Sequence, residues 1–440
     1  MNQKDRLQLA NWAVEQALKS GVTQTGVSVS RIRNGQVGFR DGKIEKLQES
    51  TDIFLNISIY AENRYSSHST SDIRKGTLDR FIRDAVAMTK YLNQDDFRSL
   101  PDPKYYAGMK DVDLHINDPD YDKVTSQEKV GIARQIQETA STQSDKIISC
   151  TSGYSDSSYE LTKVNSNGFE GHANSTSFSA GLDVTVSDQS GARPEDWEWA
   201  TVRFHKDLPA PQSLAKTAAN RALRKIGQTK LDSGLYDMVV ESRAGDGLLY
   251  SLYGAMQGSA VQQKSSFLEG KLGQRIASNK LTLVDDPFVR SGLGSTFFDG
   301  EGMIAKRRTM IDNGILKEYY VDTYYGKKLG MEPTSGSATN IVIKPGERSL
   351  NDIVGGVKKG ILINTFIGGN FNSTTGDFSY GIIGMYIQNG MIVKPVHEMN
   401  ISGNVIDLWN NLEEIGADSY VYSSWQTPSM LFRDIQFSGI

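Results

Sequence analysis

Two stretches near the N-terminus carry apolar residues at helical spacing, Lys4 to Ser20 and Thr77 to Leu92. That period predicts an amphipathic helix in each. Between them, around Val27 to Ile32 and Ile53 to Tyr60, the pattern changes to the alternating or short apolar runs of strands. Residues 1–93 therefore predict a first helix-and-sheet module.

Tight hairpin turns are predicted where Asn-Gly or Asp-Gly stands between strand-like runs, because these residues tolerate a positive φ angle. Each such turn joins two neighbouring antiparallel strands. We expect turns at Asn34-Gly35, Asp41-Gly42, Asn167-Gly168, Asn313-Gly314 and Asn389-Gly390.

A second helix-and-sheet module is predicted for residues 125–229, after a proline-rich and aromatic-rich surface linker at 94–124. It opens on Thr125-Ser126-Gln127-Glu128, the spacing of a capping box in which two side chains bind free amides at a helix start. Residues 230–440 are richer in glycine, asparagine, serine and aromatic residues and predict a β-rich C-terminal domain. The expected fold class is α+β, with two helix-and-sheet modules followed by that domain.

Charge and composition exclude several classes of function. The 440 residues include 48 basic and 52 acidic side chains, so no electrostatic footprint for nucleic acid or for an anionic membrane is present. The single cysteine, Cys150, excludes an intrachain disulfide and a multi-thiolate metal site. With no signal-peptide pattern and no run near the roughly 20 apolar residues of a membrane span, we expect a cytoplasmic protein.

Histidines offer little for a metal site, because no two of the five lie within one helical turn. A zinc site built from His172, His205 and His397 with loop carboxylates is one interpretation. Surface or hydrogen-bonded histidines are the other.

Hydroxyl and carboxylate groups in the C-terminal part give weak motifs. Gly292-Leu293-Gly294-Ser295 is half of a nucleotide-loop pattern, and Lys264-Ser265-Ser266 sets an amine beside two hydroxyls. Structural loops are the favoured interpretation of both motifs. The carboxylates Asp285-Asp286, Asp299 with Glu301, and Asp377 can bind a cation or a substrate amine, or can cap turns.

Several motifs in one order resemble landmarks of the TldD/PmbA proteins, long labelled modulators of DNA gyrase. The resemblance spans nearly the whole chain, and its order makes it more specific than any one motif. The matching segments are 40–45, 265–268, 294–302, 312–316, 375–381, 401–404 and 429–439.

The resemblance implies a bacterial cytoplasmic protease of two related subunits. The TldD-type subunit carries H-E-x-x-x-H on the helix after a strand like the one at Tyr236, and a later cysteine completes its zinc site. Here the corresponding helix, Leu248 to Gly258, contains no such ligand, and no cysteine follows Cys150. The sequence therefore resembles the PmbA branch, also called TldE, with no catalytic or metal-binding residue to carry over. Zinc is expected in a TldD-type partner.

That helix is predicted to serve packing and subunit association. Leu248, Leu252 and Ala255 form one apolar face, and Gly254 and Gly258 would admit a close neighbour.

The function expected is that of a non-catalytic subunit whose C-terminal domain forms one wall of a cleft for unfolded or extended peptides. An autonomous metallopeptidase with an unrecognised metal site, and a non-proteolytic regulator linked to gyrase toxins, are the alternatives. The isolated chain could also form a homo-oligomer. Cleft residues, or structural loop residues, are expected among Ser265, Ser266, Asp299, Glu301, Asp377 and His397.

Overall fold

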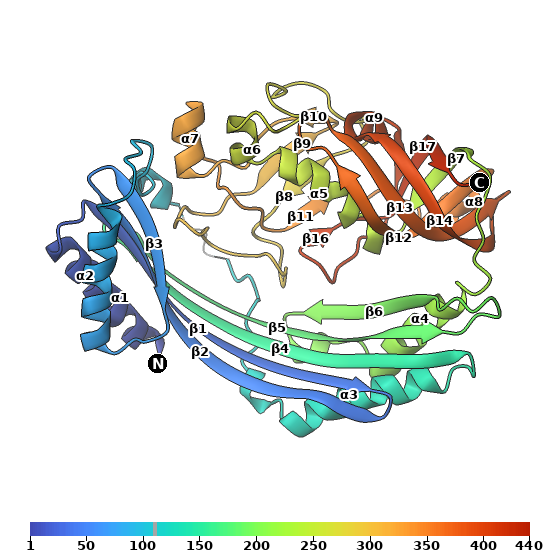
Figure 1. The fold of residues 1–440 in the computed structure, drawn as a ribbon, viewed down its shortest axis with the longest axis horizontal. Coiled ribbons are helices and arrows are strands. Elements are labelled where there is room, and N and C mark those ends of the chain that lie inside the picture. The colour runs from blue at the N-terminus through green and yellow to red at the C-terminus, as the bar shows by residue number, and fades with distance from the viewer. Residues whose placement is uncertain (109–111) are drawn as a thin grey trace.

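The computed structural model describes residues 1–108 and 112–440; residues 109–111, within the predicted linker, lie outside that description. The predicted α+β class is confirmed: a long curved sheet with helices on one side forms the N-terminal half, and a strand-rich body forms the C-terminal half (Figure 1). Within the described residues, no helix is both long and apolar enough to cross a membrane.

The first sheet runs through both N-terminal modules, because β1 pairs with β4 from Gly26 opposite Asn165 to Arg40 opposite Thr151. The two modules therefore share one sheet of order β3-β2-β1-β4-β5-β6. Its strands are β1 (Gln24–Arg40), β2 (Lys43–Ala61), β3 (Arg64–Thr70), β4 (Ile147–Asn165), β5 (Glu170–Val186) and β6 (Glu195–Val202).

Helices cover only the convex face of this sheet (Figure 1). Val27 and Val29 on β1 belong to the core beneath α1 and α2, whereas Val37 and Phe39 belong to the core beneath α3 and α4. These four side chains share a face because side chains alternate along a strand. The helices are α1 (Gln3–Lys19), α2 (Lys75–Thr89), α3 (Ser126–Ser141) and α4 (Pro211–Leu223), with short 3₁₀ turns η1 (Pro103–Tyr106), η2 (Tyr121–Lys123) and η3 (His205–Asp207).

The predicted turn at Asn34-Gly35 is wrong, because β1 passes straight through it. A Cβ on Gly35 would lie 2.6 Å from Lys129 Nζ and 2.9 Å from Asp156 Oδ1. Lys129 and Asp156 form a buried ion pair of 2.8 Å between the two cores. The glycine therefore gives room for a buried charge pair, and the turn motif is coincidental.

The other four predicted turns are confirmed, and each connects two paired antiparallel strands. Their glycines all have the positive φ angle that this kind of turn needs. They are Gly42 (φ 84°), Gly168 (φ 105°), Gly314 (φ 79°) and Gly390 (φ 76°).

The C-terminal body contains a barrel and a second, smaller sheet. Because β14 also pairs with β17, the strands β14, β13, β12, β7 and β17 close into a ring. Barrel strands are β7 (Gly234–Val240), β12 (Lys359–Phe371), β13 (Asp377–Gln388), β14 (Met391–Asn404) and β17 (Met430–Ser438), with β15 (Leu412–Ile415) beside β17. The smaller sheet has the order β10 (Ile315–Leu316), β9 (Arg308–Asp312), β8 (Leu283–Asp285), β11 (Ile341–Ile343) and β16 (Trp425–Gln426).

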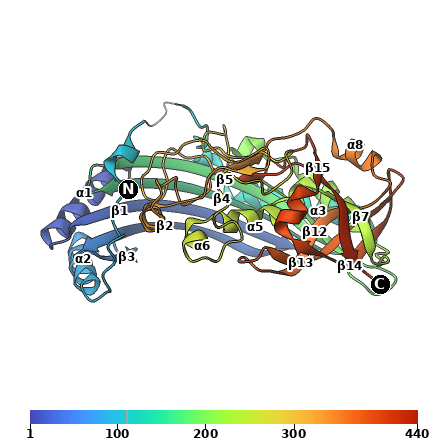
Figure 2. The ribbon, with the colours of Figure 1, turned by 90° about the horizontal axis from the view of Figure 1, so that it is seen from above.

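Short helices cover the barrel and link it to the smaller sheet. They are η4 (Ser242–Ala244), α5 (Asp246–Ala255), α6 (Gly258–Gln262), α7 (Thr323–Leu329), α8 (Leu350–Gly355) and α9 (Val405–Asn410). One large core joins both sheets of the body to α5. Figures 1 and 2 together place α5 over the middle of the N-terminal sheet, on its concave side.

Candidate functional site

The strand-helix unit β7–α5 corresponds to the place where, by the family resemblance, a TldD-type subunit would hold its metal. Leu248, Leu252 and Ala255 are at most 1% exposed and lie in the core of the body. This apolar face fixes the helix on the barrel, so the opposite face of α5 turns away from it.

The close neighbour predicted for the two glycines is found at Gly258 and not at Gly254. A Cβ on Gly258 would lie 3.1 Å from the carbonyl oxygen of Tyr320 and 3.2 Å from Tyr325 Cβ. A Cβ on Gly254 would meet no atom within 4 Å. Gly254 therefore stands on the open side of the helix.

Aromatic side chains occupy that open side. Tyr250 is 70% exposed, and its ring centroid lies 5.3 Å from that of Trp425 on β16. Tyr253 lies 5.3 Å from the same ring. We call Tyr250, Tyr253 and Trp425 the aromatic cluster. In Figure 1, α5 and β16 lie on the side of the body that turns to the sheet, so the aromatic cluster belongs to that side.

Small hydroxyl side chains line the concave face of the sheet, which is the face opposite Val27 and Val29. Apart from Ser30, each of them is partly exposed. A hydroxyl both donates and accepts hydrogen bonds, so this face is polar and adaptable. On β1, β4 and β5 these residues are Ser28, Ser30, Ser155, Ser157, Ser175, Ser177 and Ser179.

Zinc requires nitrogen, sulfur or carboxylate ligands converging on one point. After Asp246, the exposed side of α5 offers glycine and tyrosine instead. Across residues 1–108 and 112–440, no three His, Cys, Asp or Glu side chains form a group that could hold a metal ion. The described residues of this chain therefore do not fit the zinc site that the resemblance implies for a TldD-type subunit.

The three histidines considered for a metal site have separate surroundings. His172 Nδ1 is 3.1 Å from the hydroxyl of Thr162 on β4. The His205 ring lies 5.5 Å from the Phe178 ring. His397 is on β14 of the barrel, with Glu398 as a neighbour. The structure does not bring them together.

Ser265 and Ser266 form hydrogen bonds to the backbone of α5 and α6. Ser266 is 4% exposed; its hydroxyl donates to the Ala255 carbonyl at 2.6 Å and accepts from the Leu268 amide at 3.0 Å. Ser265 donates to the Ala260 carbonyl at 3.3 Å. In this structure both hydroxyls are engaged by backbone groups.

Asp299 and Glu301 lie together at a contact between the body and the sheet. Asp299 Oδ1 accepts from the amides of Glu301 and Met303, both at 2.9 Å, and Glu301 Oε2 accepts from the Thr323 amide at 2.9 Å. Burial raises the pKa of Asp299, and burial with the nearby Asp299 charge raises the pKa of Glu301 to about 7. Their environment is unusual for carboxylates, since their bonds come from neutral donors.

Asp377 lies at an exposed turn where β13 begins. It accepts hydrogen bonds from the Thr375 hydroxyl at 2.7 Å and from Asn404 Nδ2 at 3.1 Å. These bonds stabilise the charged carboxylate and lower its pKa. Its contacts are those of a turn-capping residue.

Sequence reasoning missed the aromatic cluster and the serine face. Trp425 is far from Tyr250 along the chain, and the two come together through tertiary contacts such as the parallel pairing of β11 with β16. The serine face did leave a signal, because serine recurs with period two at 175, 177 and 179. That spacing sets the side chains on one face of a strand.

The fold and this site define a class of protein: a three-part α+β chain whose strand-helix unit presents aromatic side chains to a polar, concave sheet. Three family models match it in order. They describe the PmbA/TldA metallopeptidase domain 1 (residues 26–89), central domain (119–226) and C-terminal domain (233–439).

Known relatives cover nearly the whole chain. The metalloprotease PmbA of Escherichia coli O157:H7 is 31% identical over 94% of this chain and 92% of its own. A Bacteroides thetaiotaomicron crystal structure, described as a candidate modulator of DNA gyrase, is 38% identical and matches all of both chains with a TM-score of 0.97. TldE from Thermococcus kodakarensis, 20% identical, shares the fold with a TM-score of 0.87 over 98% of this chain and all of its own. The chain belongs to the PmbA/TldA metallopeptidase family.

Proposed function

We propose that this chain is a non-catalytic subunit of a PmbA/TldD-type metalloprotease that acts on unfolded or extended peptides in the cytoplasm. A TldD-type partner would hold the zinc. The observation that carries the proposal is the chemistry of α5, whose open side has Gly247, Tyr250 and Gly254 where a zinc-binding helix needs histidine and glutamate.

The chain would contribute binding surface instead of metal ligands. The exposed ring of Tyr250, supported by Trp425, offers an apolar platform for a side chain of an extended peptide. The serines on the concave face can accept hydrogen bonds from peptide amides and donate them to peptide carbonyls, whatever the sequence of the peptide. This combination favours substrates recognised by their extended form.

Reconstitution with a TldD-type subunit tests the proposal. We expect the mixture to co-elute on gel filtration as one complex, to bind zinc through the partner, and to cleave an unfolded peptide in a chelator-sensitive manner. The isolated chain should bind no stoichiometric zinc and cleave nothing. Zinc bound in a one-to-one ratio by the lone chain, with chelator-sensitive cleavage, would establish an autonomous peptidase. A complex without any peptidase activity would favour a purely regulatory role.

A tyrosine pair tests the aromatic cluster within that complex. Tyr250→Ala removes the exposed platform, and we expect KM for an extended peptide to rise about tenfold, the order of one lost aromatic contact of about 1.4 kcal/mol. Tyr91→Ala is the matched control, since Tyr91 is 90% exposed at the end of α2. Both variants should still form the complex. Equal KM values for the two variants would remove the aromatic cluster from substrate binding.

A further inference from the structure

A cavity of about 460 Å³ lies between α4 and the barrel. Its walls come from α4, β12, β13, β14 and α8, and the aromatic cluster does not line it. The volume falls within the range of small-ligand sites, which is roughly 300–1,000 Å³. Apolar and polar side chains both line the cavity, and Leu362 and Asn364, both on β12, contribute one of each.

The apolar wall is formed by Val354, Leu362 and Met385, each at most 7% exposed. Two more apolar side chains stand at the mouth: Ile392 is 49% exposed and Val393 is 53% exposed. Adjacent exposed apolar side chains beside an apolar wall form a surface that a hydrophobic group can cover.

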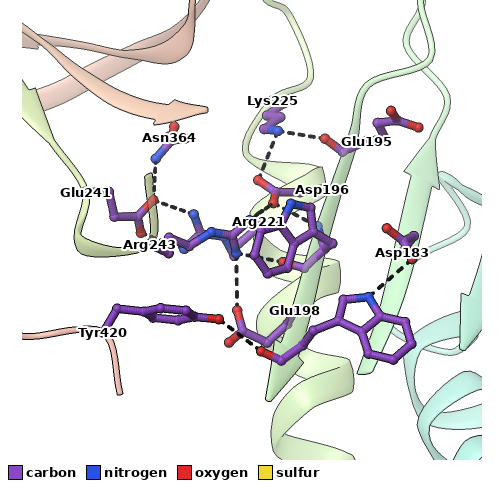
Figure 3. A network of polar contacts seen from close by, with 12 residues as sticks. Asp183, Glu195, Asp196, Glu198, Arg221, Lys225, Glu241, Arg243, Asn364 and Tyr420 are labelled. Atoms are coloured by element: carbon purple, nitrogen blue, oxygen red, sulfur yellow. Dashed lines mark hydrogen bonds and ion pairs between the residues drawn. The ribbon is translucent and has the colours of Figure 1, made fainter. Parts of the chain in front are cut away.

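One polar residue of the lining has an acceptor without a donor. Asn364 is 9% exposed, and its Nδ2 donates to Glu241 Oε2 at 3.0 Å. Because a carboxylate only accepts, this bond fixes the amide orientation and turns Oδ1 away from Glu241 (Figure 3). Within the described chain, Asn364 Oδ1 has no hydrogen-bond partner. A buried amide oxygen in this state is stabilised when a donor reaches it.

The unpaired charge around the cavity is positive. Arg221 is already engaged, since its two terminal nitrogens bind both oxygens of Glu241 at 2.7 and 2.5 Å. Asp196 is likewise engaged by three cations. Arg224 and Lys394 also line the cavity, and neither forms an ion pair with any described residue. An anion at the mouth would therefore meet two free cations.

We propose that this cavity binds the carboxyl-terminal residue of a peptide that ends in an aliphatic or aromatic side chain. Such a residue carries an amide donor, an apolar group and a carboxylate on one Cα atom. These three groups match Asn364 Oδ1, the wall at Leu362 and Met385, and the cations Arg224 and Lys394. A fatty acid lacks the donor, and a phosphate lacks the apolar group.

Binding of defined peptides to the full chain alone tests this assignment. Fluorescence anisotropy would use an N-terminally labelled Gly-Ser-Gly-Ser-Gly-Leu with a free carboxylate, the same peptide as an amide, and a version ending in aspartate. We expect the amide and the aspartate peptide each to bind at least tenfold more weakly than the free acid. Equal affinity of acid and amide would overturn the proposal.

A charge-matched pair of double variants locates the site. Arg224→Gln with Lys394→Gln should weaken the free acid at least tenfold and leave the amide unchanged. Arg193→Gln with Lys216→Gln removes two exposed cations elsewhere and should change neither. An equal loss of affinity for the free acid in both double variants would mean that net charge alone causes the effect, and it would reject the site. Matching melting temperatures would show that the folds are intact.

A competition experiment distinguishes a peptide carboxyl terminus from a free aliphatic acid as the ligand. Octanoate has the chain and the charge but no amide donor, so we expect it to displace the leucine peptide at least tenfold less well than acetyl-leucine does. Displacement by octanoate at equal concentration would assign the cavity to aliphatic acids and overturn the peptide assignment. None of these measurements needs a zinc subunit, so their outcome is separate from that of the proposed protease function.

Discussion

Two contacts between the C-terminal body and the N-terminal sheet differ in the partners of their buried carboxylates. We call Asp196, Arg221, Lys225, Glu241 and Arg243 the ionic junction; Figure 3 shows it between β6, α4 and the start of the body. Asp196 lies 2.8 Å from Arg243 and 3.0 Å from Lys225. Every buried carboxylate of this junction therefore faces a cation.

The loop junction comprises Asn165, Phe169, Phe298, Asp299 and Glu301. Phe298 packs on Phe169 with ring centroids 5.1 Å apart, and Asn165 Nδ2 donates to the Glu301 carbonyl at 2.9 Å. Its two carboxylates accept bonds from amides and a hydroxyl and form no ion pair with any residue of the described chain. Here apolar packing and neutral donors hold the surfaces together.

The difference has an electrostatic consequence. In the ionic junction, burial alone would raise the pKa of Asp196, but Lys225, Arg243 and Arg221 outweigh it and hold that pKa below its ordinary value. In the loop junction, burial dominates and raises the pKa of Glu301 to about 7. Burial of Asp196 among cations thus favours its charged form, whereas burial of Glu301 among neutral donors favours its protonated form.

Removing one charge at the ionic junction should have the largest effect. Asp196→Ala leaves Lys225, Arg221 and Arg243 facing one another without their shared partner. Breaking a buried charge network in this way typically costs about 3–5 kcal/mol. Urea unfolding of the variant should report a loss of that order.

Asp79→Ala is the matched control for the ionic junction. Asp79 pairs with Arg83 on the exposed side of α2, and surface pairs of this kind contribute about 0.3–0.5 kcal/mol. A loss from Asp196→Ala no larger than that from Asp79→Ala would mean that the ionic junction does not hold the body to the sheet.

Removing a ring at the loop junction should have the second-largest effect. Phe298 is 4% exposed, so Phe298→Ala leaves a cavity against Phe169 and should cost about 3 kcal/mol. Phe97→Ala, at a position that is 41% exposed, is the control and should cost below about 1 kcal/mol. Equal unfolding midpoints for the two variants would show that the loop junction depends on its polar bonds and not on packing.

Neither junction was predicted from the sequence, although much of the fold was. The helices at Lys4 and Thr77 and four turns follow from local periodicity and turn chemistry, which neighbouring residues decide. That α5 lacks histidine and glutamate could also be read from the sequence, since it requires only residue identities. The pairing of β1 with β4 joins residues more than 100 positions apart, and no local pattern specifies it.

The sequence did single out Asp299 and Glu301, but for their position in a glycine-rich loop. What makes them unusual is the neighbourhood that folding builds: Thr323 from α7 and Asn165 from β4. Gly35 illustrates the opposite error. Its turn motif is local, whereas the reason for the glycine, the Lys129–Asp156 ion pair, comes from two distant elements.

A pH series should separate the junctions by the sign of their response. The pKa of Glu301 is about 7 in the folded chain against an ordinary 4.5, so the folded state binds this proton more tightly. The associated stability is complete below pH 4.5 and is lost as pH rises through 7. Glu301→Gln cannot titrate. Relative to the parent, it should therefore gain about 2–3 kcal/mol in free energy of unfolding between pH 5 and pH 8.

Glu241→Gln is the counterpart in the ionic junction and should respond in the opposite direction. Burial raises the pKa of Glu241, but its bonds with Arg221 and Asn364 outweigh burial and lower it. Its stability is therefore present above the ordinary 4.5 and is lost only as pH falls below that value. We expect Glu241→Gln to be less stable than the parent by the same amount at pH 6, 7 and 8. Parallel pH profiles for the two variants would mean that the junctions do not differ in charge state, and the comparison would fail.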